Sequence, residues 1–161
     1  MIKIFLDGGN FDEIKAIKAD GYTFNPSLYR KLGAKNYLTF SKQILKKIKY
    51  KHVSLEVIAD DEKNCFRQAK ILSNLGKNVY VKIPIIFTNG KSTKNLIKKL
   101  IDENIKLNIT AIFSLNQIKE ILPHLKNSKT ILSIFSGRIF DIGMNAEVEF
   151  KKMNKYIKKN S

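Results

Sequence analysis

The chain has 161 residues, of which 30 are Lys or Arg and 14 are Asp or Glu, giving a net charge of +16. Hydrophobic residues make up 43% of it, which excludes the composition of a disordered protein. No apolar run approaches the ~18 residues that span a bilayer, and the N-terminus lacks the layout of a signal peptide. The single cysteine, Cys65, excludes an internal disulfide framework and suits a reducing compartment. We therefore expect one cytoplasmic domain over residues 1–161, without membrane association.

The positive charge comes almost entirely from lysine, since only three of the 30 basic residues are arginine. Proteins that read nucleic acids depend on arginine for bidentate contacts to bases and phosphates. Lys, Ile and Asn are all abundant here and share A/T-rich codons, which favours a compositional origin of the charge. We therefore expect no specific nucleic-acid partner, and a basic nucleic-acid-binding domain stays the less favoured alternative.

Six short apolar segments, roughly 20 to 30 residues apart and rich in Ile, Val, Phe and Tyr, are typical of β-strands. Several are apolar on both faces, which indicates a buried parallel sheet. The predicted strands are Ile2–Asp7, Tyr22–Asn25, His52–Ala59, Val79–Ile86, Leu107–Phe113 and Thr130–Phe135.

Amphipathic segments with helix signals lie between these strands. Ser114 is expected to cap one of them and Pro123 to close it, while Ser92 or Thr93 caps another. Their apolar stripes run from Tyr37 to Ile48, Phe66 to Leu75, Leu96 to Ile101, Leu115 to Leu122 and Ala146 to Ile157. The chain is therefore an α/β domain of six βα units.

Two parallel architectures fit this pattern, an open doubly wound sheet and a β/α barrel. A dinucleotide-binding open sheet needs a glycine-rich turn after its first strand. The turn here, Asp7-Gly8-Gly9-Asn10-Phe11, does not have the G-x-G-x-x-G spacing.

Nearly every predicted strand carries a polar residue where packing would favour carbon. A single such residue is often a surface charge or a structural ion pair. Together, however, they gather near the carboxyl ends of the strands, which in a barrel converge on one mouth where catalytic side chains meet. These residues are Asp7, Asn25, Glu56, Lys82, Asn108, Thr110 and Ser133, with Arg138 just beyond the last strand.

Lys82 is the most distinctive of them, because Val81 and Ile83 flank it in a continuous apolar strand. Burial disfavours a charged ammonium group, and a neutral amine can attack a carbonyl. A buried lysine with carboxylates nearby indicates Schiff-base chemistry. His52 and His124 are too few and too isolated for a histidine-rich metal site, so we expect neither a metal nor a cofactor.

At this point the sequence resembles the transaldolase family, which includes the small fructose-6-phosphate aldolase-like proteins. The resemblance implies a (β/α)8 TIM-barrel fold of which this chain holds about six βα units, with the seventh and eighth strands lacking a counterpart. The motifs that carry it, in the family's order, are Ile4-Phe5-Leu6-Asp7, Thr23-Phe24-Asn25-Pro26-Ser27, Val53-Ser54-Leu55-Glu56-Val57, Val81-Lys82-Ile83-Pro84, Asn108-Ile109-Thr110 and Gly137-Arg138-Ile139.

The resemblance also implies an activity, the transfer of a dihydroxyacetone unit between sugar phosphates. Lys82 would be the Schiff-base nucleophile, Glu56 the general acid/base, acting through a water, and Asp7 the proton acceptor during C–C cleavage. The implied substrate-binding residues are Thr23, Asn25, Asn108 and Thr110, which would hold the water and the substrate hydroxyls, Ser133, which would position the substrate, and Arg138, which would bind its phosphate.

Phe135 bears on which of the family's activities is expected, and Phe24 departs from the family's motif. Phe135 stands where the aldolases carry a tyrosine, which favours a transferase over an aldolase. Phe24 replaces a threonine and is expected to narrow the pocket. A fructose-6-phosphate aldolase-like lyase and a non-catalytic, sugar-phosphate-binding scaffold remain alternatives. Sugar phosphates are the expected partners, and we expect a homo-oligomer.

Overall fold

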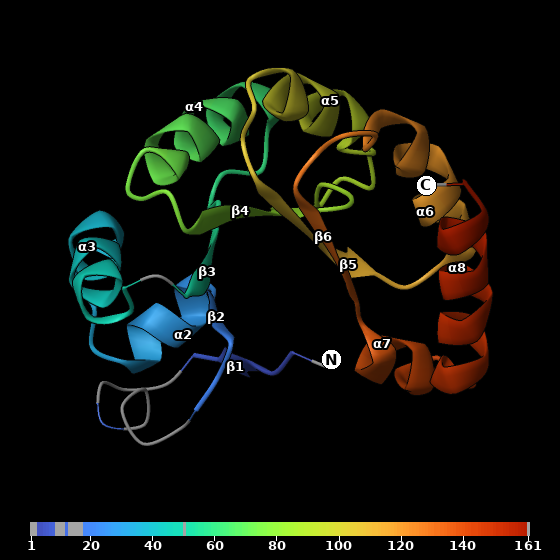
Figure 1. Ribbon diagram of the computed structural model, residues 1–161, viewed down its shortest axis with the longest axis horizontal. Helices are drawn as coiled ribbons and strands as arrows, with labels where there is room; N and C mark the ends of the chain where they lie inside the picture. The colour runs from blue at the N-terminus through green and yellow to red at the C-terminus, as the bar shows by residue number, and fades with distance from the viewer. Residues whose placement is uncertain (1–2, 9–11, 13–17, 50, 161) are drawn as a thin grey trace. The chain divides into compact units, whose positions relative to one another are not determined.

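The computed structural model describes residues 3–8, 12, 18–49 and 51–160 (Figure 1). The chain divides into two compact units, the first made of residues 1–59 and 63–82 and the second of residues 60–62 and 83–161. One strand, β4 (Val79–Pro84), runs from the first unit into the second. Each unit is described in turn.

The first unit is a parallel sheet whose strands follow one another in chain order, β1-β2-β3-β4. Helices follow the second and third strands, as parallel connections require. Besides β4, its elements are β1 (Phe5–Asp7), β2 (Gly21–Phe24), α2 (Pro26–Lys31), α3 (Tyr37–Lys47), β3 (His52–Glu56) and α4 (Glu62–Ser73).

The register of this sheet separates its apolar residues from its polar ones. Residues opposite each other on parallel strands share a face, and side chains alternate along each strand. Phe24 and Leu55 form one opposite pair, and both side chains are fully buried. On the other face Glu56 lies opposite Lys82. One face of the sheet is therefore core, and the other carries the ionisable groups.

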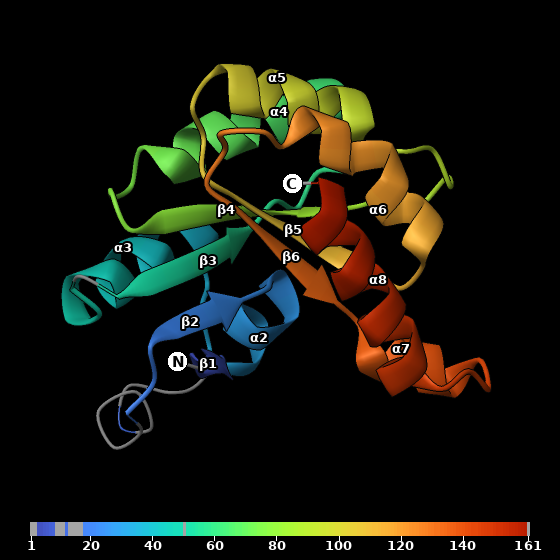
Figure 2. The same ribbon diagram turned by 45° about the vertical axis from the view of Figure 1, so that its right-hand side comes forward.

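The second unit contains the end of β4 and two further parallel strands, β5 and β6. The backbone continues from β4 alongside β5, since the Ile85 N–H donates to the Thr110 carbonyl at 2.9 Å. Helix α8 packs on α6 and on α7 (Figure 2). The elements are α5 (Lys94–Asp102), β5 (Leu107–Ile112), α6 (Leu115–Ile121), the 3₁₀ turn η1 (Leu122–His124), β6 (Thr130–Ile134), α7 (Ser136–Asp141) and α8 (Ala146–Asn160).

Residues 60–62 belong to the second unit because side chains tie them to it. Asp60 accepts hydrogen bonds from the Thr88 N–H at 2.9 Å and from the Thr88 hydroxyl, and these bonds lower the pKa of Asp60. Glu62 Oε1 lies 2.5 Å from Lys99 Nζ. The three-residue segment is thus anchored to the loop after β4 and to α5.

All six predicted strands are confirmed, with Ile2 outside the described residues. Five have shorter bounds, and the second is shifted by one residue, to Gly21–Phe24. The strands lie in chain order, β1-β2-β3-β4 in the first unit and β4-β5-β6 in the second. A doubly wound sheet reverses its order at a switch point, whereas a β/α barrel does not. The fold is therefore of the (β/α)8 barrel type with six βα units, as predicted.

Helix ends agree with the predicted signals in one case and differ in another. Ser114 caps α6, where its hydroxyl and the Gln117 side chain form a reciprocal capping box. For α5, Thr93 occupies the N-cap position, but its hydroxyl donates to the Pro84 carbonyl at 2.7 Å. The Ser92 hydroxyl, the other predicted cap, accepts from the Lys94 N–H at 3.2 Å. Across the residues described, no helix combines the length and the hydropathy needed to cross a membrane.

Candidate active site

The first unit brings Lys82 and Glu56 into direct contact. The two residues lie opposite each other on β4 and β3, and Lys82 Nζ is 3.3 Å from Glu56 Oε2. The Lys82 side chain is 10% exposed and that of Glu56 21%. Charged pairs withdrawn from water gain little stability, because desolvation offsets their attraction. A buried ion pair inside an apolar strand is therefore a candidate functional site.

The surroundings of Glu56 raise the pKa of its carboxyl group. Burial raises the pKa of Glu56, and the nearby Asp7 carboxylate raises it further, while the charge and hydrogen bond of Lys82 oppose both effects. Burial is the largest of these influences. A carboxyl group with a raised pKa exchanges protons more readily near neutral pH than an exposed one, which suits a general acid/base.

Asp7 and Thr23 form a second polar pair on the neighbouring strands. They lie opposite each other on β1 and β2, and the Thr23 hydroxyl donates to Asp7 Oδ1 at 2.6 Å. This bond fixes one carboxylate oxygen of Asp7 and leaves the other available. Asp7 also acts electrostatically on Glu56, so the two pairs are neighbours on one face of the sheet.

Asn25 has a structural task beside any role in binding. It is the N-cap of α2, and its Oδ1 accepts a hydrogen bond from the Leu28 N–H at 2.8 Å. Pro26 follows at the first helical position, where its missing N–H costs nothing. The asparagine–proline element therefore begins a helix, and the Asn25 amide nitrogen is the group left for a ligand.

The expectation that Phe24 narrows the pocket is wrong. Phe24 is fully buried and stacks on Tyr29 of α2, with ring centroids 5.2 Å apart and planes 2° from parallel. Side chains alternate along β2, so Phe24 points to the helix-covered face while Thr23 points to the face of Asp7. The phenylalanine fills the core beneath the site.

The second unit carries the other predicted residues. The Ser133 hydroxyl on β6 donates to Asn108 Oδ1 on β5 at 2.7 Å, so these two predicted residues contact each other. Thr110 is 2% exposed, and its hydroxyl oxygen has no hydrogen-bond partner among the described residues. Buried polar atoms are nearly always satisfied, and an exception points to a bound water or ligand.

A β-bulge lies at Thr110. The register passes from the Ile109–Leu132 pair to the Ile112–Ile134 pair, so Thr110 and Ala111 together stand opposite Ser133. Ala111 has a φ of +61°, a left-handed conformation that residues with a side chain rarely adopt. Bulges re-aim side chains and are frequent beside functional sites.

Phe135 and Arg138 are both at the surface of the second unit. Phe135 follows β6 at the N-cap position of α7 and is 37% exposed, so it is not a buried core residue. The Arg138 side chain is 74% exposed, and its guanidinium lies 3.3 Å from Asp141. The partner of Arg138 is on its own helix, which leaves most of the guanidinium accessible.

Two residues that no sequence pattern indicated hold the backbone at the end of β3. Tyr37 donates its hydroxyl proton to the Glu56 carbonyl at 2.6 Å, and Gln68 Oε1 accepts from the Ile58 and Ala59 N–H groups at 2.8 and 3.0 Å. Both looked like ordinary helix residues, and no sequence signal marks them. In the part of the chain that the structure describes, no cluster of His, Cys, Asp and Glu could hold a metal ion.

Comparisons with known proteins agree with this geometry. A family model described as Transaldolase/Fructose-6-phosphate aldolase matches residues 4–160. A probable transaldolase of Bartonella henselae is 34% identical over 148 residues, which are 89% of this chain and 64% of the Bartonella protein. Probable transaldolases of Methanococcus maripaludis strain C6 and Thermoplasma volcanium are 40% and 39% identical over 89% of this chain, which spans 65% and 64% of their lengths.

The strand order and the Lys82–Glu56 pair define a barrel-type β/α protein with a buried amine and carboxylate at the ends of adjacent strands. The family match covers nearly all of the chain, and the relatives exceed a third in identity. The chain belongs to the transaldolase/fructose-6-phosphate aldolase family. It spans about two thirds of the length of these relatives, at 64–65%.

Proposed function

We propose that the chain acts as a transaldolase-type enzyme that transfers a dihydroxyacetone unit between sugar phosphates through a Schiff base on Lys82. The observation that carries this proposal is the contact of Lys82 with Glu56, 3.3 Å apart and largely buried in an otherwise apolar pair of strands. The family match and the names of the relatives support the same class of reaction.

The first half of the reaction builds the Schiff base. Glu56 accepts a proton from Lys82, and the free amine attacks the ketone carbon of the sugar phosphate to form a carbinolamine. Glu56 returns a proton through a water to the carbinolamine oxygen, which leaves as water. The product is an iminium ion, whose positive nitrogen attracts electrons from the neighbouring carbon–carbon bond.

The second half breaks and remakes that bond. Asp7 accepts the proton of the adjacent hydroxyl, the C–C bond electrons move into the iminium, and an aldose phosphate leaves. Thr23 holds one Asp7 oxygen at 2.6 Å, which keeps the carboxylate oriented for this step. The enamine on Lys82 then attacks an acceptor aldehyde, and the same steps run in reverse to release the new ketose.

The other predicted substrate-binding residues lie in the second unit. Asn108, Thr110 and Ser133 remain the predicted contacts to the hydroxyls, and Arg138 the predicted contact to phosphate, for which a guanidinium fork is suited. The unpartnered hydroxyl of Thr110 supports a ligand or water there. Assembly into a homo-oligomer stays a prediction.

Phe135 favours a transferase over a lyase. A phenol at this position could deliver the proton that releases free dihydroxyacetone from the enamine, whereas a phenyl ring cannot. The enamine on Lys82 then persists until an acceptor aldehyde arrives. The proposed preference for transfer follows from that missing hydroxyl.

A two-condition assay tests the proposal. Fructose 6-phosphate should be consumed rapidly only when an acceptor aldose phosphate is present, with little free dihydroxyacetone. Accumulation of free dihydroxyacetone without an acceptor would identify an aldolase-like lyase, and no consumption would favour a non-catalytic scaffold. Lys82→Met should abolish turnover, while Lys99→Met, which breaks an exposed Lys–Glu pair, should leave it intact.

A further inference from the structure

The backbone that leaves β3 is held by side chains of α3 and α4 as well as by one backbone hydrogen bond to β4. The Glu56 carbonyl accepts from the Tyr37 hydroxyl at 2.6 Å, and the next N–H, that of Val57, donates to the Lys82 carbonyl at 3.1 Å. The peptide group between Glu56 and Val57 is thus hydrogen-bonded at both its carbonyl and its N–H. The N–H is bonded to the backbone of Lys82 itself.

The following peptide groups are anchored by α4. Gln68 Oε1 accepts from both the Ile58 and the Ala59 N–H, and the Cys65 thiol donates to the Ala59 carbonyl at 2.9 Å. Consecutive backbone groups from Glu56 to Ala59 therefore depend on side chains of α3 and α4. This is also why β3 ends at Glu56, three residues earlier than predicted.

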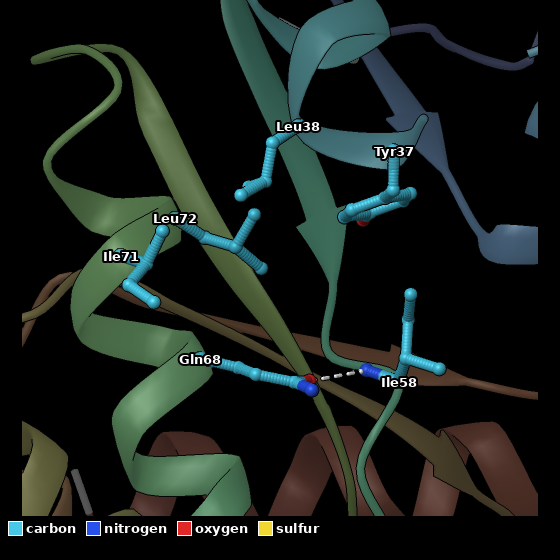
Figure 3. A pocket seen from close by; sticks show the side chains of 6 residues that line it. All are labelled: Tyr37, Leu38, Ile58, Gln68, Ile71 and Leu72. Carbon is cyan, nitrogen blue, oxygen red and sulfur yellow. Dashed lines mark hydrogen bonds between the residues drawn. The ribbon is translucent and has the colours of Figure 1, made fainter. Parts of the chain in front are cut away.

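Packing supports this segment at Val57, which is buried, but not at Ile58. Tyr37 and Gln68 stand on opposite sides of a hollow of about 140 Å³ lined also by Leu38, Ile58, Ile71 and Leu72 (Figure 3). Ile58 is 56% exposed, so its side chain does not anchor the backbone in a core. The hydrogen bonds of Tyr37 and Gln68 therefore act together with the buried Val57 to set the position of the strand end.

We propose that Tyr37 and Gln68 are positioning residues that hold the end of β3 so that the Glu56 carboxylate stays against Lys82 Nζ. The proposal deepens the proposed function, because it rests on Glu56 acting on Lys82. Neither side chain touches the reacting atoms. Tyr37 acts through the Glu56 carbonyl and Gln68 through the two peptide groups after it.

The groups around Glu56 predict how its pKa would change if the end of β3 were loosened. The charged groups that act on Glu56 are Lys82 on β4 and Asp7 on β1, while Tyr37 is the titratable group from the helix side. Burial is the main reason that the pKa of Glu56 is raised. Release of the strand end admits water, so the pKa of Glu56 falls toward its ordinary value.

The chain offers a matched control for each variant. Tyr37→Phe removes the hydroxyl that binds the Glu56 carbonyl. Tyr29→Phe removes a hydroxyl in the same aromatic cluster, 4.7 Å away between ring centroids, whose partner is Ser41. Gln68→Met removes the accepting oxygen at similar size, whereas Gln68→Glu keeps an oxygen that both N–H groups can reach.

The test measures the rate at which borohydride traps fructose 6-phosphate on the protein, as a function of pH. Tyr37→Phe and Gln68→Met should each slow trapping about fivefold, which corresponds to the ~1 kcal/mol of one buried hydrogen bond, and should move the limb of the pH profile that Glu56 sets. Tyr29→Phe and Gln68→Glu should stay within about twofold of the wild type, a difference within the scatter of single contacts. Equal trapping rates and pH profiles for Tyr37→Phe and Tyr29→Phe would overturn the proposal. If Tyr37→Phe fails to fold, the comparison of Gln68→Met with Gln68→Glu tests it instead.

A second readout separates this proposal from the proposed function. If the wild type traps no substrate, the proposed function fails. The positioning role is then tested by the titration of the Glu56 carboxyl group. The ¹³C carboxyl signal of Glu56, assigned with Glu56→Gln, should titrate at lower pH in Tyr37→Phe and Gln68→Met than in the wild type. An unchanged midpoint in both variants would overturn the positioning role whatever the activity.

Discussion

Lys82 and Glu56 face each other across adjacent parallel strands, with the ammonium nitrogen 3.3 Å from a carboxylate oxygen and both side chains mostly withdrawn from water. In each of the other described ion pairs the basic side chain is exposed, as in Lys99 with Glu62 and Lys152 with Glu149, whereas Lys82 is 10% exposed. An exposed pair adds little to stability, and a buried one costs desolvation. The position of this pair is therefore better explained by chemistry than by folding.

Replacement of Glu56 by Gln should remove one component of the pH dependence of stability. The folded-state pKa of Glu56 lies above its ordinary value of 4.5, so the folded chain keeps a proton that the unfolded chain has released. Stability from this group is full below pH 4.5 and is lost as the pH rises through the folded-state pKa. Urea unfolding at stepped pH should show the wild type losing stability relative to Glu56→Gln across that window. Wild-type stability that stays constant or rises relative to Glu56→Gln across that window would contradict a raised pKa of Glu56.

Two buried threonines of the second unit should respond oppositely to valine. Thr93 donates its hydroxyl to the Pro84 carbonyl at 2.7 Å, so Thr93→Val leaves a carbonyl unsatisfied. We expect Thr93→Val to lower the free energy of unfolding by about 1–3 kcal/mol. Thr110→Val should leave it unchanged or raise it, because the Thr110 hydroxyl has no partner among the described residues. Denaturant titration of both variants checks this, and an equal loss in the two would show that Thr110 is bonded within the protein.

Replacing Ala111 by glycine should stabilise the folded chain, and replacing it by valine should destabilise it. Its φ of +61° places the Cβ of any L-residue under strain, which glycine avoids. Ala111→Gly should raise the free energy of unfolding by about 1 kcal/mol, while Ala111→Val should lower it by about 1–2 kcal/mol. Thermal unfolding of the two variants distinguishes the directions. If both variants were destabilised equally, packing around the bulge rather than backbone strain would govern the site.

Gly21 should not tolerate a methyl group. A Cβ there would lie 2.4 Å from the Phe5 ring and 3.0 Å from the His52 carbonyl oxygen. Gly21→Ala should cost about 1–3 kcal/mol of stability, as overpacking usually does. The control is Gly137→Ala in α7, where nothing lies within 4 Å and no loss is expected. Combining Gly21→Ala with Phe5→Ala should recover part of the loss, and full additivity would argue against the clash.

The closeness of Lys82 to a carboxylate could be predicted because Lys82 and Glu56 both break a pattern. A lysine inside an apolar strand and a glutamate inside the preceding one are conspicuous against β-strand periodicity, and parallel pairing then brings them together. Alternation along β2 puts Phe24 on the opposite face from Thr23. Phe24 therefore points into the core, contrary to the expectation that it narrows the pocket.

Features that depend on the backbone or on distant segments could not be predicted. Nothing in the sequence of β5 indicates that Ala111 adopts a positive φ, because alanine is not a residue that favours it. Tyr37 and Gln68 sit on helices with no unusual spacing, and only the folded chain shows that they meet the end of β3. The residue pattern within each strand locates Lys82 and Glu56. The contacts of Tyr37 and Gln68 with the end of β3 come from tertiary structure.

The most direct test of the central claim locates the covalent intermediate. The protein is incubated with fructose 6-phosphate, reduced with borohydride, digested and mapped by mass spectrometry, with Lys82→Met and Lys99→Met in parallel. The account predicts a dihydroxyacetone-derived adduct on the Lys82 peptide, lost in Lys82→Met and retained in Lys99→Met. A folded sample with an unmodified Lys82 peptide, or an adduct that survives in Lys82→Met, would contradict it.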